Sequence, residues 1–208
     1  MGYMDGNTLL EKKNHPNYIG KKVAIIGGGN VAMDCARTIK KLGAKNVSVI
    51  YRRQEAQMPA EIKEIKDAKD EGIEFLFQNN VVKILGKDKV EKIECIKTEL
   101  VKKDGEERDF PVNIENSNYL LDMDYVVMAI GSAPEEEVMK KFGLERTKKG
   151  YIKVDEEYRT SNEKIFAGGD IIGQKGTVAF AAKSGRDAAE SIITVSYTHL
   201  RAHETSAH

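Results

Sequence analysis

A glycine turn between an apolar strand and a helix constrains this chain more than any other feature. The turn follows the apolar segment Val23–Ile26 and reads Gly27-Gly28-Gly29-Asn30-Val31-Ala32. In the pattern Gly-x-Gly-x-x-Ala, Gly27 makes the tight turn, Gly29 lets a pyrophosphate approach the backbone, and Ala32 permits close helix–strand packing. The amino end of the following helix supplies N–H donors and a partial positive charge. The pattern therefore predicts a dinucleotide site.

The segments around this turn have the spacing of a Rossmann-like α/β domain. The sequence predicts a helix over 31–42 and a strand over 47–51. It also predicts a second helix with Pro59 in its first turn and Ile62, Ile65 and Ala68 on one face, and a strand over 73–77. The segments 81–85, 90–100 and 109–114 are strand-like and are separated by charged turns. They predict an antiparallel β-meander attached to the parallel unit. A further apolar strand is expected over 125–130.

The residues after the second strand, Tyr51-Arg52-Arg53, bear on the choice of dinucleotide. An NAD site usually has an acidic residue there, which hydrogen-bonds the ribose 2′-hydroxyl. Two guanidinium groups suit a 2′-phosphate, which an acid would repel. The sequence therefore favours NADP(H) over NAD(H). The alternative is that Arg52 and Arg53 are a solvated surface pair.

The last third of the chain has a different order of elements. A short helix over 135–142 and strands over 151–154 and 164–167 lead into Gly168-Gly169-Asp170, and a helix of small residues begins near Thr177 and runs to about Ile193. The Asp170 carboxylate is suited to accept a hydrogen bond from a sugar-like hydroxyl. An ordinary turn is the alternative interpretation. We expect this part to be a fragment of a second α/β domain.

Composition narrows the functional class. The 33 Lys and Arg residues balance 33 Asp and Glu residues, so net charge gives no argument for a nucleic acid or an anionic membrane as partner. No apolar stretch is long enough to span a bilayer, and the first residues do not form a signal peptide, so we expect a cytoplasmic protein. The two cysteines, Cys35 and Cys95, form no Cys-x-x-Cys pair, and a dithiol redox centre is not expected.

The tail 196–208 differs from everything before it. It contains His199, His203 and His208. His199 and His203 have the spacing of a metal pair on a helix, but no third ligand is expected nearby. The peptide resembles a translated sequencing adapter found at the ends of unrelated proteins. We therefore expect it to be non-native, and we predict no metal site.

Six segments together resemble one protein family. The chain is similar to the small (beta) subunit of NADPH-dependent glutamate synthase and its relatives among flavoproteins with two dinucleotide-binding domains. Those relatives include the large subunit of electron-bifurcating ferredoxin–NADP transhydrogenase and dihydropyrimidine dehydrogenase. The resemblance spans residues 5–194 and is carried by the run 27–34, Tyr51-Arg52-Arg53, Met58-Pro59-Ala60, Ala129-Ile130-Gly131, Gly168-Gly169-Asp170 and the small-residue pattern 181–189.

The resemblance implies cofactors and roles for particular residues. It implies that Gly27–Ala32, Arg52, Arg53 and Gly131 bind NADP(H). Gly169 and Asp170 would lie at the flavin end, with the backbone of Thr177 and Val178 facing the isoalloxazine of FAD. The family's chemistry is hydride transfer between nicotinamide and flavin, which the cofactors carry out themselves. No catalytic side chain is therefore expected.

The chain also departs from the family pattern. An earlier glycine fingerprint for FAD and an iron–sulfur domain precede these segments in the family, and neither occurs here. We expect a lead-in linker over 1–20, an NADP-binding domain over 21–133, the C-terminal part of an FAD-binding domain over 134–195, and the tail 196–208. The FAD site would be incomplete, and iron–sulfur clusters would belong to a missing N-terminal portion or a partner.

Several functions remain open under this resemblance. The main expectation is an NADPH-linked flavoprotein oxidoreductase that feeds iron–sulfur centres, with a glutamate synthase large subunit or a ferredoxin-type protein as partner. One alternative keeps the enzyme and changes the acceptor, as in a bifurcating transhydrogenase or a sulfide dehydrogenase-like subunit. The other alternative is an isolated NADP-binding module without catalysis.

Overall fold

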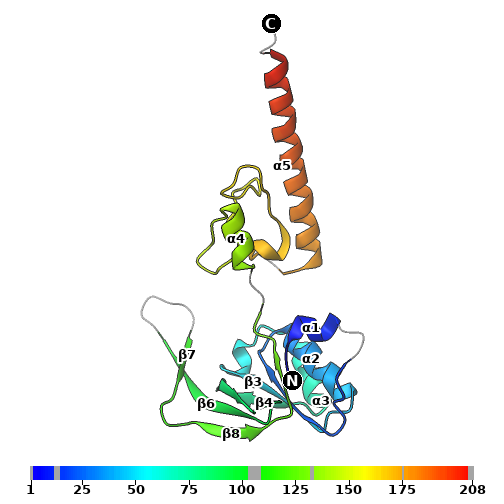
Figure 1. Cartoon of the computed structure of the whole chain (residues 1–208), viewed down its shortest axis with the longest axis vertical. Coiled ribbons are helices and arrows are strands. Elements are labelled where there is room, and N and C mark those ends of the chain that lie inside the picture. Colours follow the sequence, from blue (N-terminus) through cyan, green and yellow to red (C-terminus); the bar gives the residue numbers. More distant parts are fainter. Residues whose placement is uncertain (1, 12–14, 103–108, 132–133, 175, 206–208) are drawn as a thin grey trace. The chain divides into compact units, whose positions relative to one another are not determined.

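The computed structural model describes residues 2–11, 15–102, 109–131, 134–174 and 176–205 (Figure 1). The chain divides into two compact units, which span residues 1–131 and 132–208. We call these unit 1 and unit 2 and describe each by itself.

Unit 1 is built around a five-stranded sheet with the order β1-β9-β2-β3-β4, in which every pair of neighbours is parallel. At its centre Ile25 of β2 lies opposite Val49 of β3 and Val127 of β9. The strands are β1 (Tyr3–Asp5), β2 (Lys22–Ile26), β3 (Asn46–Tyr51), β4 (Glu74–Phe77) and β9 (Tyr125–Met128).

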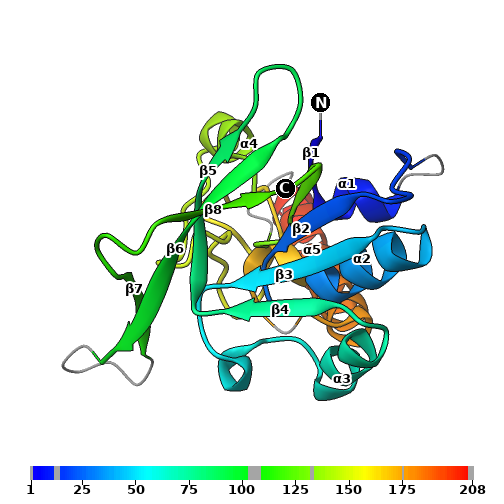
Figure 2. The ribbon, with the colours of Figure 1, turned by 90° about the horizontal axis from the view of Figure 1, so that it is seen from below.

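Each face of this sheet is covered by a different layer (Figure 2). Helices α1 (Gly6–Glu11), α2 (Asn30–Lys41) and α3 (Ile62–Asp70) cover one face. An antiparallel sheet covers the other face. Because successive side chains of a strand point to opposite faces, Val23 and Ile25 pack in the core with the helices, whereas Ala24 packs in the second core. Central strands buried on both faces are typical of a parallel sheet.

The antiparallel sheet confirms the meander expected from the sequence and adds a strand to it. Its long strand β6 (Lys92–Val101) pairs with all three others. The added strand is β8, a four-residue segment shortly before β9 that the sequence analysis did not predict. The remaining strands are β5 (Asn79–Leu85), β7 (Phe110–Asn113) and β8 (Tyr119–Asp122).

The first twenty residues differ from the linker that the sequence predicts. Strand β1 pairs with β9 in the parallel sheet, and Leu9 of α1 is fully buried. Helix α1 also lies close to α2, since a Cβ atom on Gly6 would be 2.9 Å from Val31 Cγ1. This segment belongs to unit 1 through contacts with residues far along the chain. A short strand without periodicity gives no sign of such contacts in the sequence.

Unit 2 contains helices α4 (Glu136–Phe142) and α5 (Val178–Thr205) and the short helix η2 (Gly169–Ile172). The strands expected over 151–154 and 164–167 are wrong: each segment forms only an isolated bridge, Arg146–Ile152 and Arg159–Phe166. Their backbone groups bond to segments that are not strands: the Ile152 N–H donates to the Ile171 carbonyl and the Ala167 N–H to the Tyr158 carbonyl, both at 3.0 Å.

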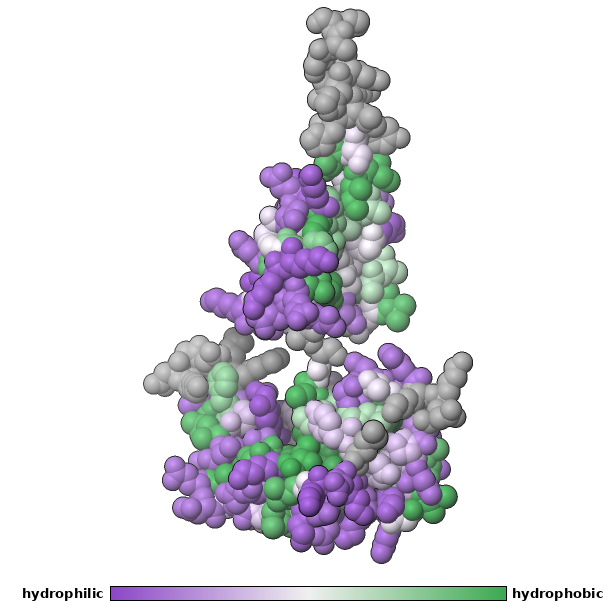
Figure 3. All heavy atoms as spheres, viewed as in Figure 1, coloured by the Kyte–Doolittle hydropathy of each residue, from purple (hydrophilic) through white to green (hydrophobic). Residues whose placement is uncertain are grey.

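Helix α5 continues to Thr205, beyond the end expected near Ile193. The segment 194–205 contains neither glycine nor proline, so nothing in the sequence terminates the helix there. Apolar residues lie along its described surface (Figure 3), and Val178 is 88% exposed. Within the described residues, no helix combines the length and apolar character needed to cross a bilayer. The residues 206–208 lie outside the described part of the chain.

An ion-pair cluster joins α2 to α3. Arg37 Nη1 lies 2.5 Å from Glu64 Oε2, and Arg37 Nη2 lies 2.9 Å from Glu71 Oε1. The hydrogen bond from Arg37 holds the pKa of the Glu71 carboxyl below its ordinary value. Helix α3 is thus fixed to α2 by charge on its outer side and by Ile65 and Ala68 on its buried side.

Helix α3 begins at Ile62, so the prediction that Pro59 lies in its first turn is wrong. The expected apolar face of α3 is also wrong at one position, which provides a test of burial. Ile62 is 86% exposed, whereas Ile65 is 6% exposed. We expect Ile65→Ala to lower the free energy of unfolding by about 2–4 kcal/mol, because it leaves a cavity in the core. The control Ile62→Ala should change it by less than about 0.5 kcal/mol in urea denaturation. Equal losses in the two variants would contradict the placement of α3.

Candidate dinucleotide site

The glycine turn lies at the carboxyl ends of β2, β3 and β9. Gly27 has φ +141°, a region that side-chain-bearing residues rarely adopt. A Cβ atom on Gly27 would be 2.1 Å from the Ala129 carbonyl oxygen, and the Gly27 N–H donates to the Ile50 carbonyl at 3.1 Å. Only glycine fits between these strands. The crevice at this edge of a parallel sheet is where ligands bind in open α/β folds.

Gly28 makes room for an aromatic ring. A Cβ atom there would be 2.7 Å from ring carbons of Tyr51. The Tyr51 hydroxyl donates to the Gln57 carbonyl at 2.7 Å. The ring of Tyr51 therefore lies against the glycine turn, and its hydroxyl fixes the short helix η1 (Glu55–Gln57) that follows.

At position 29, neither packing nor backbone conformation requires a glycine. It is the N-cap of α2 with φ −94°, and the nearest atom to a Cβ placed there is Pro59 Cγ at 3.9 Å. Its carbonyl accepts from the N–H groups of Ala32 and Met33, which begin the helix. The N–H groups of the first turn precede the intrahelical bonds and point out of the helix end. Gly29 therefore leaves open space in front of a group of donors.

The segment after η1 closes one side of this space. The Ala60 N–H donates to the Gly28 carbonyl at 3.1 Å, and the Glu61 N–H donates to Asn30 Oδ1 at 2.9 Å. Sequence reasoning placed Asn30 among the cofactor residues. In the structure its side-chain oxygen holds the 59–61 segment against the start of α2. Apart from the family resemblance, nothing in the sequence indicated that Met58-Pro59-Ala60 contacts the turn, because the contact joins segments about 30 residues apart.

Arg52 and Arg53 follow directly on β3, next to the glycine turn. Arg52 is exposed and Arg53 is half-buried. Among the described residues, neither guanidinium takes part in an ion pair, in contrast to Arg37 with its carboxylate partners. Their carbonyls are held in place: Thr98 Oγ1 donates to Arg52 at 2.8 Å and the Gln78 N–H donates to Arg53 at 3.0 Å. Two positive charges are thus available beside the turn.

Gly131 lies just beyond β9, on the same sheet edge as the glycine turn. It has φ +100° and is exposed, and the preceding Ile130 is 69% exposed. Apart from its chain neighbours, no described residue has an atom within 4 Å of a Cβ placed on Gly131, so packing against them does not require a glycine there. The positive φ angle of residue 131 is what favours a glycine at this position.

The glycine motif of unit 2 has a packing explanation. A Cβ atom on Gly168 would be 3.1 Å from Ser184 Oγ of α5, and the Gly169 N–H donates to that oxygen at 2.8 Å. The buried Ser184 thus ties η2 to α5. Asp170, Thr177 and Val178 are exposed near the beginning of α5. Packing accounts for Gly168, and the φ of +74° favours glycine at position 169. The cofactor roles of Gly169, Asp170, Thr177 and Val178 remain predictions.

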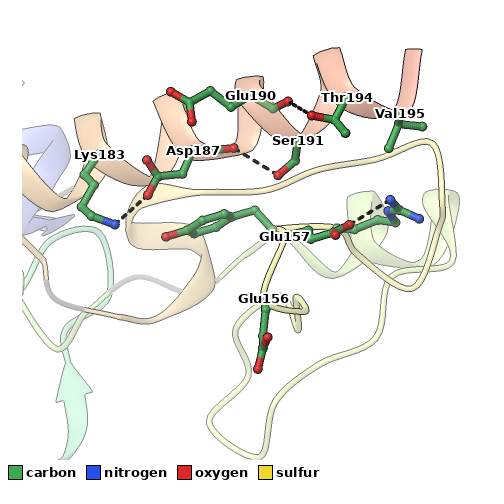
Figure 4. A pocket seen from close by; sticks show the side chains of 10 residues that line it. Glu156, Glu157, Lys183, Asp187, Glu190, Ser191, Thr194 and Val195 are labelled. Atoms are coloured by element: carbon green, nitrogen blue, oxygen red, sulfur yellow. Dashed lines mark hydrogen bonds and ion pairs between the residues drawn. The ribbon is translucent and has the colours of Figure 1, made fainter. Parts of the chain in front are cut away.

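A hollow of about 640 Å³ lies elsewhere in unit 2, between α5 and the 156–159 loop (Figure 4). Its charges are largely paired, with Lys183 Nζ 2.6 Å from Asp187 Oδ2 and Arg159 Nη2 3.1 Å from Glu157 Oε2. None of the residues predicted to bind a cofactor lines it. The candidate site is therefore the glycine turn of unit 1, with Arg52 and Arg53 beside it.

The two cysteines are buried in separate cores. Cys35 packs with the helices, and Cys95 packs between the two sheets. Burial raises the pKa of the Cys35 thiol to about 12 and that of Cys95 to about 11. The two thiols are free and lie on opposite faces of the parallel sheet, so they do not form a redox disulfide.

Unit 1 is an α/β domain of the Rossmann type, with a glycine turn at the carboxyl edge of its parallel sheet. The family model described as pyridine nucleotide-disulphide oxidoreductase matches residues 2–188, so the chain belongs to this family. Among solved structures, T. acidophilum thioredoxin reductase is 25% identical with a TM-score of 0.70, over 94% of this chain and 58% of that one. Mycobacterium tuberculosis FprA in complex with NADPH, 19% identical with a TM-score of 0.72 over 91% of this chain and 56% of that one, shares the fold.

Curated relatives place the chain more closely. It is similar to glutamate synthase small chains and is 39% identical over 179 residues to the NADPH glutamate synthase small chain of Halomonas elongata. That match covers 84% of this chain and 38% of the relative. The beta subunit of NADP(+)-dependent formate dehydrogenase from Moorella thermoacetica is 38% identical, over 92% of this chain and 28% of that protein. The chain thus spans less than two fifths of these relatives.

The contrast between Gly27 and Gly29 yields a prediction of stability. We expect Gly27→Ala to lower the free energy of unfolding by about 2–4 kcal/mol, because the methyl group meets the Ala129 carbonyl and φ is strained. Gly29→Ala has an open Cβ position and an ordinary φ, so it should change the free energy by less than about 0.5 kcal/mol. Urea denaturation of both variants measures this difference. Comparable stability of the two would refute the close approach at Gly27.

Burial of the cysteines predicts their reactivity. Only a thiolate reacts with dithionitrobenzoate, and both thiols are fully buried with raised pKa values. At pH 8 the native protein should release no thionitrobenzoate within minutes, and both thiols should react in guanidinium chloride. A Cys35→Ser variant should lose half of the denatured signal. Rapid labelling of the native chain would show that one core is open.

Proposed function

We propose that unit 1 binds NADP(H). The observation that carries the proposal is the open position at Gly29, in front of the α2 N–H donors and next to Arg52 and Arg53, which form no ion pair with a described residue. The pyrophosphate would lie against Gly27–Ala32, where backbone donors and the helix dipole favour negative charge. The 2′-phosphate would lie on Arg52 and Arg53, whose guanidinium groups match a phosphate in geometry and charge. Gly131 would border the site from β9.

The residues of the site fit such a ligand. Gly27 and Gly28 are required by the fold, but Gly29 is not, so its small size is explained by a ligand that approaches the backbone. The segment 57–61 is fastened to the turn by hydrogen bonds of Ala60 and Asn30. Backbone that is already held in place lowers the entropic cost of binding, because little has to be ordered when the ligand arrives.

For the whole protein we propose an NADPH-linked flavoprotein oxidoreductase of the glutamate synthase small-subunit type. The bound nicotinamide and flavin would supply the redox chemistry, a hydride transfer. The residues of this chain bind and orient the cofactors. Unit 1 would hold NADP(H). In unit 2, Gly169 and Asp170, with the backbone of Thr177 and Val178, would contribute to an FAD site. Iron–sulfur centres would belong to the rest of the protein or to a partner, such as a glutamate synthase large subunit or a ferredoxin-type protein.

A second candidate has the same site and another electron acceptor. The formate dehydrogenase beta subunit of Moorella thermoacetica is 38% identical to this chain, almost as similar as the Halomonas elongata glutamate synthase small chain. The two candidate functions share the NADP(H) site and differ only in the partner that receives or donates the electrons. Binding of NADP(H) to the 208-residue chain therefore tests what both have in common.

The arginine pair predicts the cofactor preference. We expect Arg52→Ala combined with Arg53→Ala to raise the dissociation constant of NADP⁺ about 30- to 100-fold, because each charged hydrogen bond to phosphate is lost. The dissociation constant of NAD⁺ should change by less than about twofold, since NAD⁺ lacks the 2′-phosphate. Isothermal titration calorimetry on the full chain measures both.

Two variants act as controls for this experiment. Gly29→Ala should weaken NADP⁺ and NAD⁺ alike, because its methyl group blocks the pyrophosphate that both share. Lys148→Ala removes an exposed positive charge in unit 2 and should leave both affinities unchanged. Equal weakening of NADP⁺ and NAD⁺ by the arginine double variant would reject the 2′-phosphate assignment.

A further inference from the structure

A buried hydroxyl connects the antiparallel sheet to the arginine pair. Thr98 of β6 is 3% exposed, and its Oγ1 donates to the Arg52 carbonyl at 2.8 Å. Thr98 lies 46 residues from Arg52 in the sequence and belongs to the other sheet. Buried threonine hydroxyls usually form a hydrogen bond with another polar group. Here that group is the backbone carbonyl of Arg52, which is expected to bind phosphate.

Gln78 completes this connection. Its N–H donates to the Arg53 carbonyl at 3.0 Å, and its own carbonyl accepts from the Thr98 N–H at 2.8 Å. Gln78 has φ +56°, a conformation that is uncommon for a residue with a side chain and is kept only where surrounding contacts enforce it. The carbonyls of both arginines are therefore held from the side of β6, one directly by Thr98 and one through Gln78.

We propose that Thr98 is a positioning residue that sets the preference for NADP(H) over NAD(H). The inference rests on the proposed function of unit 1. Holding the Arg52 carbonyl fixes the backbone of the two residues after β3, and so the direction from which their side chains start. Without the hydroxyl, the arginine backbone would have to be ordered when the 2′-phosphate binds, which weakens binding.

The glycine turn is held by hydrogen bonds that do not involve Thr98. A change at Thr98 should therefore affect only the binding of the 2′-phosphate. Gly27 is tied to Ile50, and the 59–61 segment is tied to Gly28 and Asn30. None of these bonds involves Thr98. A ligand without a 2′-phosphate should therefore not respond to a change at this position.

The test compares NADP⁺ and NAD⁺ binding to the full chain by calorimetry. We expect Thr98→Val, which keeps the shape and removes the hydroxyl, to raise the dissociation constant of NADP⁺ about three- to tenfold. The constant for NAD⁺ should change by less than about twofold. Thr98→Ser, which keeps a hydroxyl, should restore the NADP⁺ affinity that Thr98→Val loses. Thr160→Val makes the same substitution at a buried threonine of unit 2 and should affect neither ligand.

A purely structural role gives a different pattern. Equal weakening of NADP⁺ and NAD⁺ by Thr98→Val, no weakening of either, or failure of Thr98→Ser to restore NADP⁺ affinity would overturn the proposal. If Thr98→Val does not fold, Thr98→Ser and Thr98→Ala are compared instead, since these two differ only in the hydroxyl. Their NADP⁺ affinities should differ at least threefold, and equal affinities would reject the role of the hydroxyl.

The arginine double variant separates this inference from the proposed function. If Arg52→Ala with Arg53→Ala abolishes the NADP⁺ preference and Thr98→Val does not alter it, the phosphate site stands and the role of Thr98 is wrong. If the double variant leaves the preference intact, the phosphate site itself is wrong, and the proposal for Thr98 falls with it.

Discussion

The contact between Gly27 and the Ala129 carbonyl is the constraint on which the site depends. The carbonyl is so close that a Cβ atom on Gly27 would overlap it, so β9 can run beside β2 to the end of the sheet only because residue 27 is glycine. The hydrogen bond from Gly27 to Ile50 ties the same point to β3. The turn is thus fixed against both neighbouring strands, and the amino end of α2 opens over the carboxyl edge of the sheet.

Double burial of the central strands links this turn to the rest of unit 1. Alternate residues of β2 and β3 pack in two different cores, one with the helices and one with the antiparallel sheet. Loss of either layer would leave one face of the parallel sheet in water. The antiparallel sheet is therefore part of the same folding unit as the dinucleotide turn, and its strand β6 reaches the residues that follow β3 through Thr98.

The sequence predicted those features of fold and site that depend on local pattern. The glycine turn, helix α2, strand β3 and the placement of Arg52 and Arg53 after that strand all come from residues that are neighbours in the chain. Strand β1 could not be predicted, because its three residues become a strand only through pairing with β9, more than 120 positions away. The bonds of Thr98 and Asn30 were missed for the same reason: a hydroxyl or amide in a sequence does not show which distant backbone group it will meet.

Unit 2 shows the opposite error, in which local pattern predicted too much. The segments 151–154 and 164–167 have the apolar composition of strands, yet each makes one bridge. Apolar character can bury a segment, but strand geometry also needs a neighbour that takes up the backbone N–H and C=O groups. The exposed Val178, Ile192 and Ile193 of α5 likewise have apolar side chains without cover in the described part of unit 2. Both observations concern long-range neighbours, which decide whether an apolar segment becomes a strand or a covered helix face and which local composition does not specify.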